Sequence, residues 1–185
     1  VEVLAASGGD QPPLVDSKTG AVEIGPQETR ANTIQLQARL PAGRVTAFRL
    51  ECAAVAPEAG FQWSELQVSA VAPQPQRQAL RAVVADDSLA AVEIAKVLDN
   101  NRTTRVAVAA RAGRPVRTVF ELEPPLVGDA PREIEIELGV ENAGGATRWR
   151  LTVCDADADL LVPAGIAAVA KIEAAKRKPD ELRQL

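Results

Sequence analysis

Apolar and polar residues alternate with a period of two along two segments in the first half of the chain. The first segment is Arg44-Val-Thr-Ala-Phe-Arg-Leu-Glu51, and the second is Phe61-Gln-Trp-Ser-Glu-Leu-Gln-Val-Ser69. In an extended backbone this period places every second side chain on the same face, so that one face enters a core and the other meets water. Both segments are therefore predicted to be β-strands.

Similar patterns recur along most of the chain. They predict strands at residues 1–5, 21–24, 33–40, 45–52, 63–71, 80–84, 105–109, 118–122, 133–140 and 148–154. Clusters of turn-forming residues separate most of them, such as Pro41-Ala-Gly43, Pro124-Pro125 and Asn142-Ala-Gly-Gly145. Many short strands of this kind are typical of a sandwich or barrel. We expect an all-β antiparallel β-sandwich of the jelly-roll type, whose inward side chains include Phe48, Leu50, Phe120 and Leu151.

Two segments have helical character instead. Residues 89–98 carry apolar side chains at helical spacing, and Asp87 or Ser88 is placed to cap them. Residues 166–178 are rich in alanine, and Pro179 marks the stop of such a helix. A chain of 185 residues is long enough for one core. We therefore expect one sandwich domain at 1–162 and a helical C-terminal extension at 163–185.

Composition narrows the chemistry. The chain contains no histidine and no tyrosine, so catalysis through a histidine base is excluded. Its net charge of -4 gives no electrostatic footprint for nucleic acid, and it has no run of about 18 apolar residues, so we expect neither nucleic acid nor membrane as a partner. The chain starts without methionine and without the pattern of a signal peptide, and we interpret it as a piece of a longer protein.

The two cysteines, Cys52 and Cys154, both lie at the end of a predicted strand. They could form a disulfide if those strands are neighbours with Cα atoms within about 7 Å. The alternative is that both are free, since unpaired cysteine is a common small buried residue.

Five short segments occur in an order that is typical of one known domain family. They are Val45-Thr-Ala-Phe-Arg-Leu-Glu51, Trp63-Ser-Glu-Leu-Gln-Val68, Leu98-Asp-Asn-Asn-Arg-Thr-Thr104, Gly113-Arg-Pro115 with Thr118-Val-Phe-Glu-Leu122, and Arg148-Trp-Arg-Leu-Thr-Val153. Together they resemble a galactose-binding-like, carbohydrate-binding-module-like domain of planctomycete proteins, over most of residues 4–185. The resemblance implies a non-catalytic β-sandwich in a large exported protein that also carries a cytochrome c-like segment.

The third of these segments is the candidate metal site. The family pattern there is Asp-Gly-Asn, two variable residues and Thr-Gly-Trp; this chain keeps Asp99, Asn101 and Thr104 but has Asn100 and Arg105 in place of the glycines. Oxygen-bearing side chains on a tight turn suit calcium, so we expect a structural calcium held by Asp99, Asn101 and Thr104. The alternative is an Asx turn that satisfies its own backbone.

The candidate ligand site lies in the loops at one end of the predicted sandwich. Sugar recognition uses an aromatic platform with planar polar groups around it. Most of the five aromatic residues are expected in the core, and Phe61 or Trp63 is the best candidate for an exposed platform. The polar side chains around it would be Asn101, Arg105 and Arg117, and the arginines favour an anionic glycan.

Three functions remain open from the sequence. The first is a non-catalytic module that binds polysaccharide weakly, and the second is a structural module that meets neighbouring domains of the parent protein. The third is an enzyme that uses paired carboxylates, such as Glu51 and Glu65, on the pattern of glycosidases. Because carboxylates on strands are mostly surface residues, the third is the least favoured.

Overall fold

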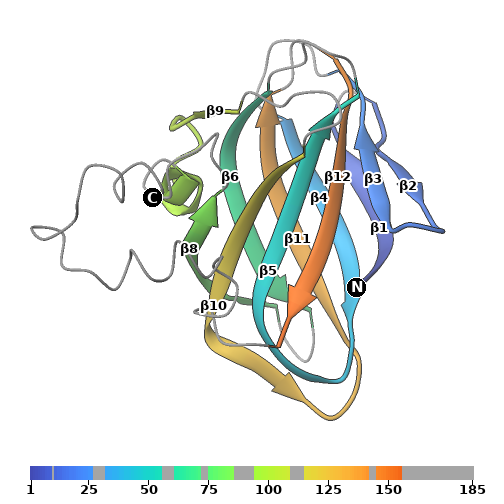
Figure 1. Cartoon of the computed structure of the whole chain (residues 1–185), viewed down its shortest axis with the longest axis vertical. Coiled ribbons are helices and arrows are strands. Elements are labelled where there is room, and N and C mark those ends of the chain that lie inside the picture. Colours follow the sequence, from blue (N-terminus) through green and yellow to red (C-terminus); the bar gives the residue numbers. More distant parts are fainter. Residues whose placement is uncertain are drawn as a thin grey trace, which may run out of the picture.

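The computed structural model describes residues 1–9, 11–26, 32–55, 61–71, 75–85, 94–108, 115–141 and 145–155. This part of the chain folds into two six-stranded antiparallel sheets that pack face to face (Figure 1). Both the all-β class and the antiparallel pairing predicted from the alternating pattern are confirmed. The predicted C-terminal helix lies outside the described residues. No helix in the described part is long and apolar enough to cross a membrane.

The strands of the first sheet, sheet A, run in the order β1-β4-β11-β6-β7, with β9 also paired to β6. Their bounds are β1 Glu2–Gly8, β4 Asn32–Leu40, β6 Phe61–Ala70, β7 Gln76–Arg77, β9 Val106–Val108 and β11 Arg132–Glu141. Sheet B has the order β2-β3-β12-β5-β10-β8. Its strands are β2 Leu14–Asp16, β3 Ala21–Ile24, β5 Gly43–Ala54, β8 Ala79–Ala85, β10 Val116–Gly128 and β12 Thr147–Cys154.

Within these sheets, β3-β12-β5-β10 faces β4-β11-β6-β7, so the chain changes sheets between most successive strands. This order is of the jelly-roll kind. The side chains predicted to face inward do so: they are 1%, 2%, 0% and 6% exposed at Phe48, Leu50, Phe120 and Leu151. Alternation therefore identified the buried face of the central strands correctly.

One pair of prolines does not separate strands as predicted. Pro124 and Pro125 lie inside β10, where the register with β5 shifts between Glu121 and Leu126. Proline lacks the N–H that a sheet ladder requires, and a bulge is one of the places where a strand tolerates it. The strand therefore continues past the prolines to Gly128, and a short turn then leads to β11 in the other sheet.

A short 3-10 helix, η1 at Ala95–Leu98, closes the side of the sandwich between β6 and β8. Ile94 and Val97 are both fully buried in the common core, which fixes this segment to the two sheets. The sequence predicts an α-helix over 89–98; the described part of that range shows only this single turn, and residues 86–93 lie outside the description.

Cys52 and Cys154 do not form a disulfide in this structure. Cys52 is buried, whereas Cys154 is partly exposed and pairs in register with Ala47 on the same neighbouring strand, β5. Strand β12 carries its inward side chains at Trp149 and Leu151, so Cys154 faces outward. Two cysteines on opposite faces of one sheet cannot be bridged without moving the backbone.

Candidate functional site

The turn that follows η1 is closed by its own hydrogen bonds. The Asp99 Oδ1 accepts a bond from the Asn101 backbone N–H at 2.7 Å. The Asn101 Oδ1 accepts bonds from the Thr103 backbone N–H at 3.1 Å and from the Thr103 hydroxyl at 2.7 Å. The backbone N–H of Thr104 donates to the Asn101 carbonyl at 2.9 Å. These contacts are those of consecutive Asx turns.

Asp99 and Asn101, two of the residues predicted to hold calcium, thus each use one side-chain oxygen to accept hydrogen bonds from within the turn. Among the described residues, no group of three acidic or cysteine side chains is placed to hold a metal ion. Glu65 lies close to the turn, since Gln67 contacts both Glu65 and Asn100, but it faces an arginine. The geometry is that of the Asx-turn alternative, and calcium binding stays a prediction.

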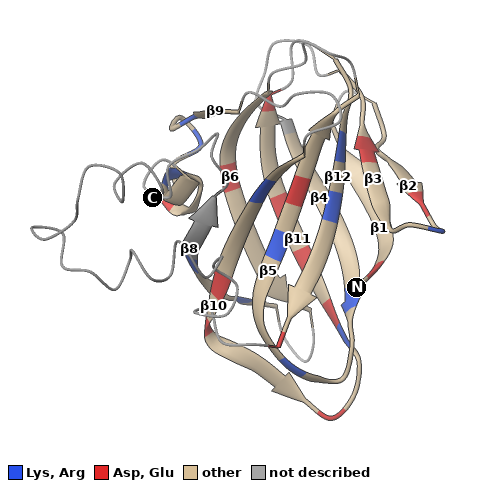
Figure 2. Cartoon of the chain, viewed as in Figure 1, with Lys and Arg blue, Asp and Glu red and all other residues tan. Residues whose placement is uncertain are grey.

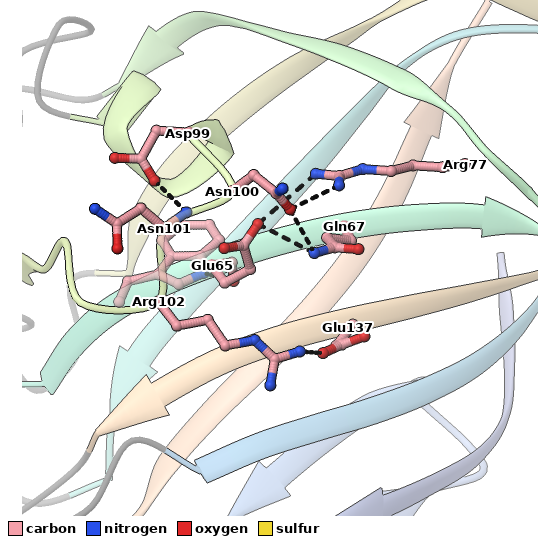
Figure 3. A network of polar contacts seen from close by, with 9 residues as sticks. Glu65, Gln67, Arg77, Asp99, Asn100, Asn101, Arg102 and Glu137 are labelled. Carbon is pink, nitrogen blue, oxygen red and sulfur yellow. Dashed lines mark hydrogen bonds and ion pairs between the residues drawn. The ribbon is translucent and has the colours of Figure 1, made fainter.

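Asn100 connects this turn to sheet A. Its φ of 61° is in the left-handed region, which asparagine tolerates better than most residues. Its Oδ1 accepts bonds from Arg77 Nη1 at 2.8 Å and from Gln67 Nε2 at 3.3 Å (Figure 3). A left-handed backbone explains how asparagine can stand where the family pattern has glycine.

A buried carboxylate lies at the centre of this network. Glu65 is 1% exposed, and its Oε1 accepts a bond from Gln67 Nε2 at 3.3 Å and lies 3.8 Å from Arg77 Nη2 (Figure 3). Its Oε2 is buried and has no hydrogen-bond partner in the part of the chain that the structure describes. The carboxylate is thus neutralised by one arginine, whose side chain is 45% exposed. We refer to Glu65, Gln67, Arg77 and Asn100 as the Glu65 network.

Glu65 faces outward because β6 contains a bulge. Gly139 is paired with Glu65 but Val140 with Trp63, so Ser64 is an extra residue. The bulge lets Trp63 point inward on one side and Glu65 outward on the other. Gly139 makes room for it, because a Cβ there would lie 2.4 Å from the Ser64 Oγ and 3.1 Å from the Glu65 Cβ.

Arg102 extends from the same turn across the outer face of sheet A. Its guanidinium is paired with Glu137 on β11 and lies 3.5 Å from the Thr33 hydroxyl on β4 (Figure 3). Arg105 follows and pairs with Glu141 at 3.2 Å. Each of these arginines has a carboxylate of its own, so the turn is fastened to the sheet by paired charges.

The aromatic platform that the sequence predicts is not available. Phe61 and Trp63 are 3% and 2% exposed. Their rings pack edge to face in the core, with centroids 5.1 Å apart for Phe61 and Trp149 and 5.5 Å for Trp63 and Trp149. The Trp63 Nε1 donates to the Glu65 carbonyl at 2.9 Å, so its polar atom is satisfied inside. The expectation of an exposed ring at either position was wrong, because the inward face of β6 includes both.

The other aromatic residues are buried as well: Phe48, Phe120 and Trp149 are 1%, 0% and 1% exposed. These five are all the aromatic residues in the chain. A ligand therefore meets only aliphatic and polar side chains on this protein.

The structure also separates the polar residues of the predicted ligand site. Asn101 and Arg105 lie beside sheet A, whereas Arg117 lies on β10 in sheet B and donates its Nε to Glu51 at 3.0 Å. The predicted cluster of these three side chains at one loop end therefore does not form. Glu51 and Glu65, the carboxylate pair of the enzyme alternative, likewise belong to different sheets.

Arg117 instead belongs to a group of arginines on the outer face of sheet B. In the strand register, Arg150 on β12 and Arg117 on β10 stand opposite Glu51 on β5, one on each side. Arg49 lies two residues before Glu51, on the same face, and is paired with it. Arg148 on β12 pairs with Glu23 at 3.0 Å. We call Arg49, Arg117, Arg148 and Arg150, together with Glu51, the arginine face.

Figure 2 shows basic segments on β12, β5 and β10, with an acidic segment of β5 between them. The arginine side chains are exposed, at 49% for Arg49 and 56% for Arg117, while that of Glu51 is only 13% exposed. Burial alone would raise the pKa of Glu51, but hydrogen bonds from Arg117 and Arg49 outweigh it and lower this pKa below its usual value. Glu51 is therefore a fixed negative charge among arginines.

Sequence reasoning missed both the Glu65 network and the arginine face. The network joins residues 65, 67, 77 and 100, and nothing in the local pattern shows that the turn folds back onto β6. The arginine face did leave a signal, since Arg49, Arg148 and Arg150 occupy outward positions of predicted strands and Arg117 directly precedes one. Only the strand order, β12-β5-β10, brings them together.

No protein-family model matches the chain, and no curated protein matches it. Two solved structures are similar to this chain at a low level. One is TmCBM61 in complex with β-1,4-galactotriose, which is 10% identical over 80% of this chain and 87% of that chain, with a TM-score of 0.35. The other is a structure of the carbohydrate-binding modules from the β-sandwich superfamily described as having promiscuous specificity, 10% identical over 75% of this chain, with a TM-score of 0.21. The match covers 56% of that second chain. At this level of similarity, function has to be argued from this chain's own residues.

Proposed function

We propose that this chain is a non-catalytic carbohydrate-binding module of a larger exported protein, and that it binds polysaccharide through the arginine face. The observation that carries the proposal is the set of exposed arginines on three neighbouring strands of one sheet, with a half-buried counter-charge between them. Guanidinium groups are planar and can donate two parallel hydrogen bonds, which suits paired oxygens on a sugar. Export and a multidomain parent are supported by the sequence resemblance alone.

Binding through such a surface is expected to be weak. All aromatic side chains are buried, so no ring is available to cover the apolar face of a sugar. The flat outer face of a sheet also leaves much of the ligand in water. Affinity would then depend on several neighbouring subsites along a chain, as multivalent binding allows.

Two observations on the residue types and their positions support the proposal that the chain is not an enzyme. There is no histidine in the chain to act as general base. The two-carboxylate mechanism of glycosidases requires side chains within about 10 Å across one cleft. Glu51 and Glu65 lie on different sheets, and each is held by arginine.

The experiment is affinity electrophoresis of the purified protein in gels that contain one polysaccharide each. We expect slower migration in at least one gel, compared with a gel without polysaccharide. Unchanged migration in every gel, at low ionic strength and at millimolar sugar, would overturn the proposal. In that case the alternative of an interdomain scaffold module, without a glycan ligand, would remain.

A further inference from the structure

One carboxylate lies among three arginines at the centre of sheet B. Glu51 accepts hydrogen bonds from Arg49 and Arg117, and Arg150 stands opposite it in register on β12. No ion pair of Arg150 is found among the described residues. The fourth arginine of the face, Arg148, is balanced by Glu23.

The pairing of arginines with carboxylates is different on sheet A. There Arg77, Arg102 and Arg105 each face a carboxylate that they do not share with another arginine. The centre of the arginine face thus places three arginines, Arg49, Arg117 and Arg150, around the single carboxylate of Glu51, although the whole chain has a net charge of -4. This local excess of arginine is a feature of one sheet face in an acidic molecule.

The spacing of the guanidinium groups is set by the sheet. Neighbouring strands are about 4.8 Å apart, and side chains on one face of a strand repeat about every 7 Å. Arg150, Glu51 and Arg117 form one row across three strands, and Arg49 lies in the next row. A linear polymer with regularly spaced anionic groups can contact several of these arginines at once.

We propose that the ligand of the arginine face is an anionic polysaccharide, carrying carboxylate or sulfate groups, and that Glu51 is an internal competitor that limits its affinity. This inference rests on the proposed function and specifies its ligand class. Arg49, Arg117 and Arg150 bind the ligand's anionic groups, while the negative charge of Glu51 repels them. Neutral polysaccharides gain nothing from this arrangement and bind less tightly.

The test measures retardation in gels that contain heparin, polygalacturonate or a neutral galactan, at low salt and at about 0.3 M salt. Arg49→Gln and Arg150→Gln are each expected to weaken binding to the two anionic polymers about three- to tenfold. Glu51→Gln is expected to strengthen it by a similar factor and to increase its dependence on salt, because one more positive charge is left uncompensated. Arg39→Gln is the matched control, since Arg39 is also exposed and ion-paired but lies on sheet A.

The outcomes separate the ligand class from the function. Retardation by galactan alone, or anionic binding that is the same in Arg49→Gln, Arg150→Gln and Arg39→Gln, overturns the inference while glycan binding stands. Unchanged binding of Glu51→Gln overturns the role of the carboxylate. Equal binding to double-stranded DNA and to heparin would show a general polyanion surface and overturn the glycan as its specific ligand. Thermal melting of each variant shows whether it is folded.

Discussion

The Glu65 network gives the sharpest stability prediction, because a buried carboxylate depends on one arginine. Arg77→Leu removes the positive charge 3.8 Å from the Glu65 Oε1 and the donor to Asn100. Coulomb's law at this distance gives about 4 kcal/mol at an effective dielectric constant of 20 and about 1 kcal/mol in bulk water. Since Glu65 is buried but Arg77 is 45% exposed, we expect a loss of about 2 kcal/mol in the free energy of unfolding. That corresponds to a fall in melting temperature of about 4–8 °C.

Arg39→Leu is the matched control for this measurement. Arg39 is also 45% exposed and pairs with Glu2 and Glu133 on sheet A, but those two partners are 66% and 49% exposed. Such a surface pair is worth about 0–1 kcal/mol. Urea unfolding, followed by the fluorescence of the two buried tryptophans, measures both variants. An equal loss for Arg77→Leu and Arg39→Leu would refute the reasoning, as would a failure of Glu65→Gln to recover part of the loss in the Arg77→Leu background.

Three further predictions concern other parts of the molecule. Gly139→Ala is expected to lower the free energy of unfolding by about 1–3 kcal/mol, because its Cβ would lie 2.4 Å from the Ser64 Oγ. Ser64→Ala should recover part of this loss when the two substitutions are combined. If urea unfolding shows that the effects of the two substitutions simply add, the explanation is contradicted. The pKa of Glu51 is lower in the folded protein than in the unfolded chain, so its ionised form adds stability above the usual pKa of glutamate, and this stability is lost as the pH falls through the lower folded value. Glu51→Gln should therefore reduce the fall in melting temperature between neutral and acid pH. An unchanged fall in melting temperature would count against this role of Glu51. If the turn binds calcium as the sequence predicts, the melting temperature should be higher in calcium than in a chelator, and Asp99→Ala should abolish this difference. The same melting temperature in calcium and in chelator would show that the residues form only an Asx turn.

The central strands could be predicted because alternation is a local property. Phe48 and Leu50 on β5, and Phe120 on β10, share a face with their own second neighbours, and this parity is enough to place them in the core. The same parity puts Phe61 and Trp63 on one face of β6, but one of these rings was expected to be exposed, and both are buried. The short edge strands β2 and β7 have too few residues for a pattern to appear.

The candidate sites could not be predicted in the same way. The bulge at Ser64 reverses the parity of β6 without any glycine or proline at that position, so the sequence did not show that Glu65 is buried beside Arg77. The predicted grouping of Arg105 with Arg117 failed because the two residues, close in sequence, enter different sheets. The arginine face depends on pairings between β5, β10 and β12, which are separated by about 60 to 100 residues. Strand order of this kind is a property of the whole chain.

The order of strands also decides when the molecule can fold during synthesis. The centre of sheet A is filled by β11, between β4 and β6, and the centre of sheet B is filled by β12, between β3 and β5. A nascent chain that ends before residue 132 can pair β4 only with β1, and it leaves β3 joined only to the short β2. Pairing between distant segments is slow, and unpaired strand edges invite aggregation in the meantime. Neither sheet can therefore be completed until its late central strand, β11 or β12, has been synthesised.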